Sequence, residues 1–151
     1  MRHLVLAALL TLHPLSIAAE PLAILPVKLL DTSREPGDQG AAHEARLLLL
    51  ADVLKAETKG AILLDAAAIA DCQPQTTACL LDKARATGAD WALFVVVQKT
   101  STLILQIFAN LVDVGTGDLI VSRNLNFRGD NDESWRRAAR FLARQLRDAS
   151  N

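Results

Sequence analysis

The first third of the chain has a short apolar stretch followed by a helical repeat of apolar positions. Leu22 to Leu30 is almost wholly apolar and predicts a strand. Pro26 inside it cannot donate a ladder hydrogen bond, so we expect this strand to be irregular there or to lie at a sheet edge. After the polar loop Asp31 to Gly40, the stretch Ala41 to Thr58 has helical spacing, and Gly60 ends it. The apolar positions of that repeat are Ala45, Leu48, Leu49, Val53 and Ala56.

The middle of the chain repeats the order of strand and helix. Ala61 to Leu64 predicts a second short strand. Thr76 or Thr77 caps a following helix, and Gly88 stops it. Trp91 to Val97 is continuously apolar and rich in β-branched residues, which is typical of a strand covered on both faces.

Two segments with a period of two come next. Gly115 to Gly117 lies between them as a turn signal, so they predict an antiparallel hairpin. The apolar face of the first segment is Leu103, Leu105, Ile107, Ala109 and Leu111, and that of the second is Leu119, Val121, Leu125 and Phe127.

The last segment predicts a helix from Asp132 to Asp148. Asp130 and Glu133 have the spacing of a capping box at its start. The complete order is strand, helix, strand, helix, three strands and a helix. This order predicts an α/β (α+β) fold: a mixed five-stranded sheet, helices packed on it, and a C-terminal antiparallel hairpin followed by the final helix.

The N-terminus has the pattern of an export signal. Arg2 precedes the apolar run Leu4 to Leu12, and small residues near Ala18 and Ala19 suit a cleavage site. We therefore expect residues 1–19 to be a signal peptide and residues 20–151 to be a single domain, periplasmic or secreted and soluble after cleavage. A membrane anchor is the alternative, but the run is much shorter than the roughly 20 residues that span a bilayer, and we expect no transmembrane segment in the mature chain.

Charge and cysteine content narrow the function classes. The chain has 16 Lys+Arg against 17 Asp+Glu and no Tyr, which argues against a nucleic-acid binder. Cys72 and Cys79 predict a structural disulfide in an oxidising compartment; free thiols and a redox or metal pair are the alternatives. His43 is the sole histidine after the predicted cleavage, so we expect no metal site.

The last helix carries a candidate partner surface. At about 100° per residue its arginines fall within one sector, opposite Trp135 and Leu142. They are Arg136, Arg137, Arg140, Arg144 and Arg147. They predict a surface for an acidic partner or an anionic lipid headgroup; an ordinary solvated face is the alternative.

Polar residues at strand ends form a candidate ligand site. Asp31, Asp65 and Lys99 each follow or end a predicted parallel strand, and Ser101 lies just beyond. Ligands bind beyond the carboxyl ends of such strands, although Lys99 between two carboxylates is equally typical of a structural ion pair. We find no catalytic residue: the sequence lacks a nucleophile elbow, a phosphate loop and a base–nucleophile pair, so we expect a non-enzyme without a cofactor.

Several stretches resemble known envelope proteins. Ala23 to Val27 resembles the first strand of the TolB N-terminal domain, a fold shared with curli-secretion lipoproteins. Thr87 to Trp91 and Val112 to Gly117 resemble its junction and hairpin motifs. Gln98 to Ser101 and Phe127 to Trp135 resemble a family of small secreted proteobacterial proteins of unknown function. The resemblance implies a TolB-like fold and brings no activity with it.

Two functional hypotheses follow. The first is a non-enzymatic periplasmic protein-binding or assembly module of the cell envelope, which recognises its partner through a sheet edge or the arginine helix. The second is a small-ligand carrier or sensor that uses the strand-end residues. Apolar residues on the second face of the hairpin, such as Ile104, Phe108 and Val112, leave a homo-oligomer open.

Overall fold

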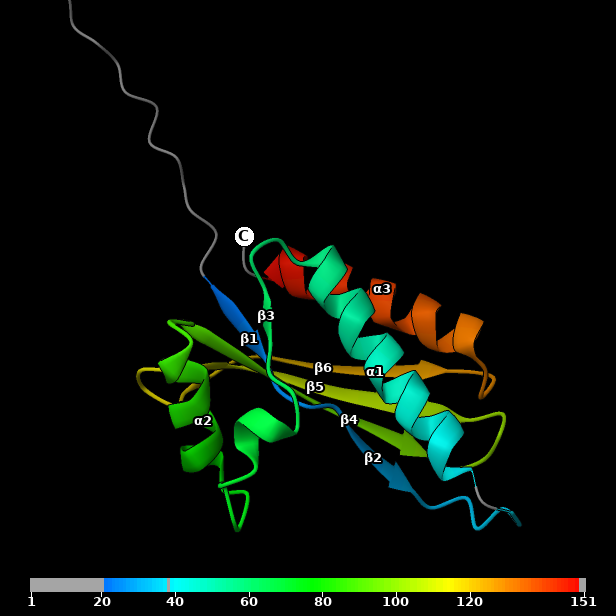
Figure 1. Ribbon diagram of the computed structural model, residues 1–151. Coiled ribbons are helices and arrows are strands. Elements are labelled where there is room, and N and C mark those ends of the chain that lie inside the picture. Colours follow the sequence, from blue (N-terminus) through cyan, green and yellow to red (C-terminus); the bar gives the residue numbers. More distant parts are fainter. Residues whose placement is uncertain (1–20, 38, 150–151) are drawn as a thin grey trace, which may run out of the picture.

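The computed structural model describes residues 21–37 and 39–149, so the predicted signal peptide lies outside the described residues. One mixed sheet forms the centre, in the strand order β3-β1-β4-β5-β6, and β2 also pairs with β4. Helices α1 (Gly40–Glu57) and α3 (Asp132–Ala149) lie on one face of it. Helix α2 (Thr77–Ala86) and a 3-10 turn, η1 (Ala67–Ile69), lie on the other face (Figure 1). The predicted fold class is confirmed.

The first predicted strand is divided in two. β1 (Leu22–Ile24) and β2 (Lys28–Asp31) flank Pro26, and both pair with β4 in parallel. The expected irregularity at Pro26 is confirmed, because a residue without an N–H falls where the ladder is interrupted. The edge position is wrong for β1, which lies between β3 (Ile62–Leu63) and β4.

Helix α1 buries a different face from the predicted one. Its buried residues include Leu50, Ala51 and Leu54, whereas Leu48 is 60% exposed. Leucines occupy four consecutive positions, 47 to 50, so apolar residues surround this part of the helix and periodicity cannot select a face. The contacts of α1 with the sheet and with α3 determine which face of α1 is buried.

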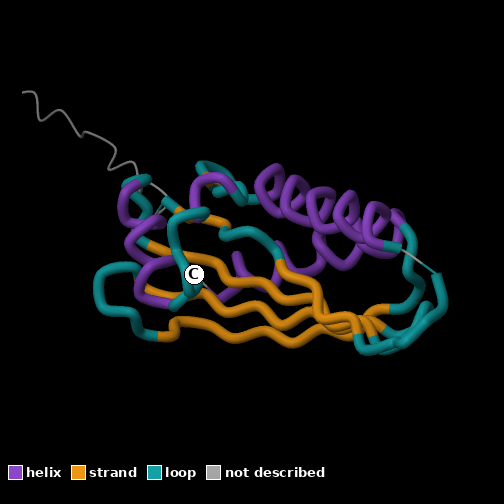
Figure 2. Tube along the Cα trace, turned by 60° about the horizontal axis from the view of Figure 1, so that its bottom comes forward, coloured by secondary structure: helices purple, strands orange, loops and turns teal. Residues whose placement is uncertain are grey.

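The second half of the sheet is antiparallel. β4 (Trp91–Lys99), β5 (Leu105–Asp113) and β6 (Leu119–Phe127) pair in sequence order, and Figure 2 shows the strands as one twisted layer. Leu105, Ile107, Ala109 and Leu111 share the buried face as expected, but Leu103 lies in the preceding loop and is 67% exposed. Gly117, with φ of +78°, occupies the left-handed position of the hairpin turn.

The start of α3 differs from the predicted capping box. The Asn131 side chain accepts the hydrogen bond from the Ser134 backbone N–H, at 3.0 Å. Asp130 does not cap the helix, because its carboxylate is bound by His43 and Arg46 of α1 and by the Trp135 side chain of α3. The capping role therefore moves by one residue.

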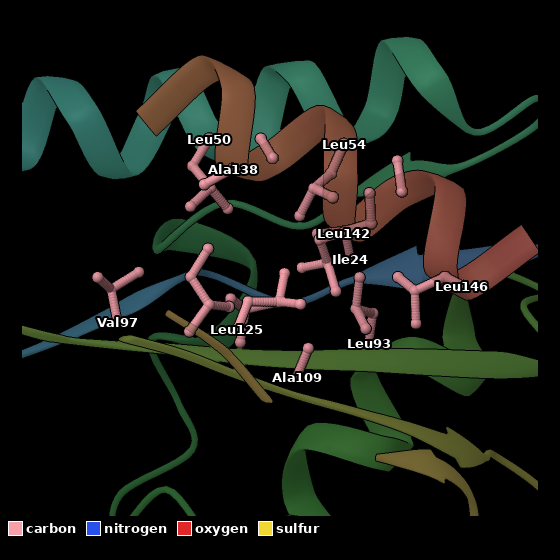
Figure 3. Close-up of a cluster of buried hydrophobic side chains, with 14 of the residues drawn as sticks. Ile24, Leu50, Leu54, Leu93, Val97, Ala109, Leu125, Ala138, Leu142 and Leu146 are labelled. Atoms are coloured by element: carbon pink, nitrogen blue, oxygen red, sulfur yellow. The ribbon is translucent and has the colours of Figure 1, made fainter. Parts of the chain in front are cut away.

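Two apolar cores hold the layers together. The larger lies between the sheet and helices α1 and α3, where Leu50, Leu54 and Leu142 meet Ile24 and Leu93 of the strands (Figure 3). The smaller lies under α2 and η1 and contains Cys72, which is 1% exposed. Cys72 and Cys79 form the predicted disulfide, with Cα atoms 5.7 Å apart. Among the described residues, none of the helices has the length and apolar character needed to span a bilayer.

Candidate functional site

Lys99 is the centre of a buried polar cluster at one end of the sheet. It ends β4 on the face that packs against α1 and α3, directly beside Asp31 of β2 in the strand register, and its side chain is fully buried. A buried ammonium group requires partners because it has lost its water. Its Nζ lies 2.9 Å from both Glu35 Oε2 and Asp130 Oδ2 and 2.7 Å from Gln39 Oε1, with His43 Nε2 farther away at 3.4 Å.

Asp130 is the main acceptor in this cluster, and its side chain is only 3% exposed. Besides Lys99, three groups contact its carboxylate at 2.9 Å: His43 Nε2, Arg46 Nη1 and Trp135 Nε1. Burial alone would raise the pKa of Asp130. The surrounding donors outweigh burial and lower this pKa from 3.8 to about 2. Asp130 is therefore a stably ionised carboxylate inside the protein.

Neighbouring groups also shift the pKa values of Lys99 and Asp31. Burial opposes the charged form of Lys99, but its hydrogen bonds to Glu35 and Asp130 prevail and raise the pKa of Lys99 above 10.5. Hydrogen bonds from the side chain and the backbone N–H of Ser33 lower the pKa of Asp31, which lies 3.9 Å from His43 Nδ1.

These contacts join three loops that are far apart in the sequence. Glu35 and Gln39 belong to the loop after β2, and Asp130 belongs to the loop after β6. Glu35 Oε1 also accepts from the Thr102 backbone N–H in the loop after β4, at 2.6 Å. The three loops gather at one end of the sheet (Figure 1). We call this set the Lys99 cluster: Glu35, Gln39, His43, Arg46, Lys99 and Asp130.

The structure brings together only part of the predicted strand-end site. Asp31 and Lys99 are neighbours, and the Ser101 Oγ, in the next loop, accepts from the backbone N–H of Leu103 and Ile104. Asp65 is bound elsewhere: its carboxylate accepts from the Ala68 N–H and caps η1. β3, which precedes Asp65, pairs with β1 opposite Leu93 rather than Lys99, so the two strand ends lie at different levels of the sheet.

Sequence reasoning missed most members of the Lys99 cluster. One signal was present: His43 and Arg46 are three residues apart, which places two polar groups on one side of the predicted helix, and Gln39 lies four residues before His43 in the predicted loop. Every buried side-chain nitrogen or oxygen within the described ranges has a hydrogen-bond partner. The charges of the cluster therefore satisfy one another, and its clearest effect is to anchor the loops.

The arginines of α3 divide into two groups. Arg136 pairs with Glu133 at 3.2 Å, and Arg140 and Arg147 lie 3.7 and 3.8 Å from the carboxylate of Glu57 in α1. The other two, Arg137 and Arg144, have no carboxylate within ion-pair distance in the part of the chain that the structure describes. Arg137 bonds the Ser134 Oγ, and the Arg144 guanidinium lies 5.6 Å from the centre of the Phe141 ring.

A groove runs between α3 and the outer strand β6; Arg137 lines it, and Arg144 lies beside the lining residue Phe141. Its volume is about 330 Å³, and its apolar wall includes Phe141, which is 44% exposed. It is lined by Leu125, Asn126, Phe127, Arg128, Ser134, Arg137, Ala138 and Phe141. Within the described part of the chain β6 pairs only with β5, so its other edge is left unpaired there.

Two further arginines, one in β6 and one just after it, add positive charge to this surface. Arg128 lines it, and Arg123 shares its side of β6 with Leu125 and Phe127 by alternation. Arg123 donates to the Ser122 carbonyl oxygen, and neither it nor Arg128 has a described carboxylate partner. We call the surface formed by the groove and its rim of Arg123, Arg128, Arg137 and Arg144 the arginine groove.

The family of the chain follows from its sequence. The profile of the DUF3280 family, described as "Protein of unknown function (DUF2380)", matches residues 20–146. The chain belongs to this family. The resemblance to a family of unknown function is thereby confirmed. A search of curated proteins found no significant match.

Solved structures of low sequence identity share the fold. PelC from Paraburkholderia phytofirmans, solved as a dodecamer, is 15% identical with a TM-score of 0.54, and the match covers 86% of each chain. The hypothetical protein CT253 from Chlamydia trachomatis is 11% identical with a TM-score of 0.55, over 85% of this chain and 96% of that one. TolB from Acinetobacter baumannii is 16% identical with a TM-score of 0.53; the match covers 89% of this chain and 29% of TolB. The TolB-like fold is confirmed.

Proposed function

We propose that this protein is a non-enzymatic binding module of the cell envelope, and that it recognises an acidic, extended segment of a protein partner at the arginine groove. The observation that carries this proposal is the set of four arginines without a described carboxylate partner around an apolar groove. Arginines that only solubilise a helix pair readily with nearby acids, as Arg136 and Arg140 do here. The four at the groove leave their charge available to a ligand.

The backbone of β6 adds a second means of recognition. An extended peptide laid along an open strand edge gains main-chain hydrogen bonds, while its side chains enter the adjacent groove. Acidic side chains of such a segment would reach the arginine rim, and apolar ones would contact Phe141 and Phe127. The sheet edge and the arginine helix, two separate hypotheses from the sequence, thereby become one surface.

We propose that this binding module acts in the periplasm or outside the cell. The Cys72–Cys79 disulfide fits an oxidising compartment, and the predicted signal peptide fits export. PelC, which has the same fold, was solved as a dodecamer, so this fold is compatible with a role in assembly. The alternative of a small ligand at Asp31, Lys99 and Ser101 stays a prediction, since the buried charges there already have partners within the described chain.

Fluorescence anisotropy with two labelled peptides tests the proposal. One peptide alternates Glu and Val and the other alternates Lys and Val. We expect the Glu peptide to bind and the double variant Arg137→Glu/Arg144→Glu to weaken it at least tenfold, because each reversal turns an attraction into a repulsion. The matched control is Arg136→Glu/Arg140→Glu, which changes the net charge equally but alters paired arginines. This control should retain most of the binding.

Two results would count against the proposal. Equal losses in the two double variants, at unchanged melting temperatures, would mean that overall charge and not the arginine groove attracts the peptide. Binding to vesicles that contain anionic lipid, with no binding to either peptide, would replace the protein partner by a membrane surface.

A further inference from the structure

A second surface, on the opposite side of the sheet from α1 and α3, is left uncovered by the fold. Along β4, β5 and β6 the odd-numbered residues face the large core, so the even-numbered ones face the other way. On that side α2 and η1 cover Ala92 and Val112. Beyond α2 no described helix lies on this side (Figure 1).

The uncovered residues form three rows across the strands, given by the strand register. We call them the open face. The rows are Lys28–Val96–Phe108–Asn124, Leu30–Gln98–Gln106–Asn126 and Asn110–Ser122; Phe94, in register with Asn110, packs against the smaller core.

The open face has an unusual composition for a solvated surface. Its only charged residue is Lys28, at one edge, and it has no Asp or Glu, although the chain has 17 of them. Leu30 is 51% exposed and Phe108 is 37% exposed. The solvated face of an antiparallel sheet is ordinarily polar, and exposed apolar residues gathered on one face mark an interaction site.

The chemistry of the open face matches a copy of itself. A two-fold contact brings the same residues of two molecules together, so the surface must be self-complementary. Side-chain amides meet this condition, because Asn and Gln both donate and accept hydrogen bonds, and Val96 and Phe108 can pack against their own copies. The arginine groove fails the condition, since its four arginines would face four others.

We propose that the open face binds the open face of a second copy, giving a two-fold symmetric dimer by sheet-on-sheet packing. A standard interface uses roughly 20–30 residues a side, and the open face offers fewer. The dimer is therefore concentration-dependent, and of the residues that line the arginine groove it covers only Asn126.

Sedimentation velocity on the purified protein, from roughly 1 to 500 μM, tests the dimer. We expect a reversible monomer–dimer equilibrium that Phe108→Lys weakens at least tenfold. Gln98→Glu preserves side-chain size, brings two like charges together in the dimer, and should weaken it as well. The control is Phe141→Lys, which alters an exposed phenylalanine of similar accessibility in the arginine groove and should leave the equilibrium unchanged. Thermal melts verify that each variant is folded.

Three outcomes would overturn the dimer. The parent protein could stay monomeric across the whole concentration range, or the folded Phe108→Lys and Gln98→Glu variants could associate as strongly as the parent. The third is that Phe141→Lys alone loses association. The Glu–Val peptide assay gives an independent readout. Phe108→Lys should bind that peptide as the parent does, so failure of the dimer and failure of the arginine groove are distinguishable.

Discussion

The buried carboxylate of Asp130 contributes to the acid stability of this protein. Its pKa is about 2 in the folded protein, against 3.8 as its ordinary value. Because the folded pKa is the lower one, the folded state takes up this proton only at lower pH than the unfolded chain. The contribution of ionised Asp130 to the free energy of unfolding is complete above about pH 5 and is lost as the pH falls toward 2. Its size is about 2 kcal/mol.

The replacement Asp130→Asn removes this titration while it keeps the side-chain size. At pH 7 we expect the variant to be less stable by about 2 kcal/mol or more, because Lys99 also loses one of its two carboxylate partners. Urea titrations followed by circular dichroism at steps between pH 7 and pH 2 would measure both proteins. The difference between them should shrink by about 2 kcal/mol across this range.

The comparison isolates Asp130 from the other carboxyls with lowered pKa values, since both proteins retain them; these are Asp31, Glu35, Asp71 and Asp113. Asp132→Asn is the matched control: Asp132 is two residues away and contacts Arg46, but its side chain is 70% exposed. This control should follow the pH dependence of the parent. Parallel curves for Asp130→Asn and the parent down to pH 2 would refute the reasoning.

Three further replacements test the disulfide and the packing of the core. Cys72→Ser with Cys79→Ser should lower the unfolding free energy by about 2–3 kcal/mol, measured by urea titration, with no added effect of reductant; equal stability would contradict the loop-closure argument. Trp135→Phe keeps an aromatic ring but removes the indole donor to Asp130, and should cost about 1–3 kcal/mol in the same assay. Leu142→Ala leaves a cavity between α3 and the sheet and should cost about 2–5 kcal/mol, whereas a change below 1 kcal/mol would mean that the core closes around the gap.

The periodicity of apolar residues in the sequence was sufficient to predict the main helices and strands and the fold class. The alternation along β5 and β6 identified the hairpin, and the continuous apolar run identified β4 as a strand. The expectation that both faces of β4 are covered is only partly correct, because α2 and η1 cover the second face at Ala92 and Phe94 but not at Val96 and Gln98. The buried side of α1 could not be predicted, because four consecutive leucines give no preferred stripe and only the neighbours in space decide.

The candidate sites were predictable to a smaller extent. Lys99 was singled out beside Asp31, and the structure places the two side by side. Asp130 was assigned to the helix start, since acids there are ordinarily caps; its real partners come from β4 and α1, far away in the sequence. Likewise, the arginines of α3 are equivalent by angle alone; Glu133 pairs with Arg136 within the helix, and the position of Glu57 in space decides that Arg140 and Arg147 are also paired.

The position of β1 has a consequence for the order in which the protein can be made. β1 opens the described chain but lies between β3 and β4, and its Leu22 pairs with Trp91. A ribosome releases the N-terminus first, so this strand must wait for β4, and the core must wait for β5, β6 and α3. The topology thus delays completion of the sheet and its core until most of the chain has been synthesised.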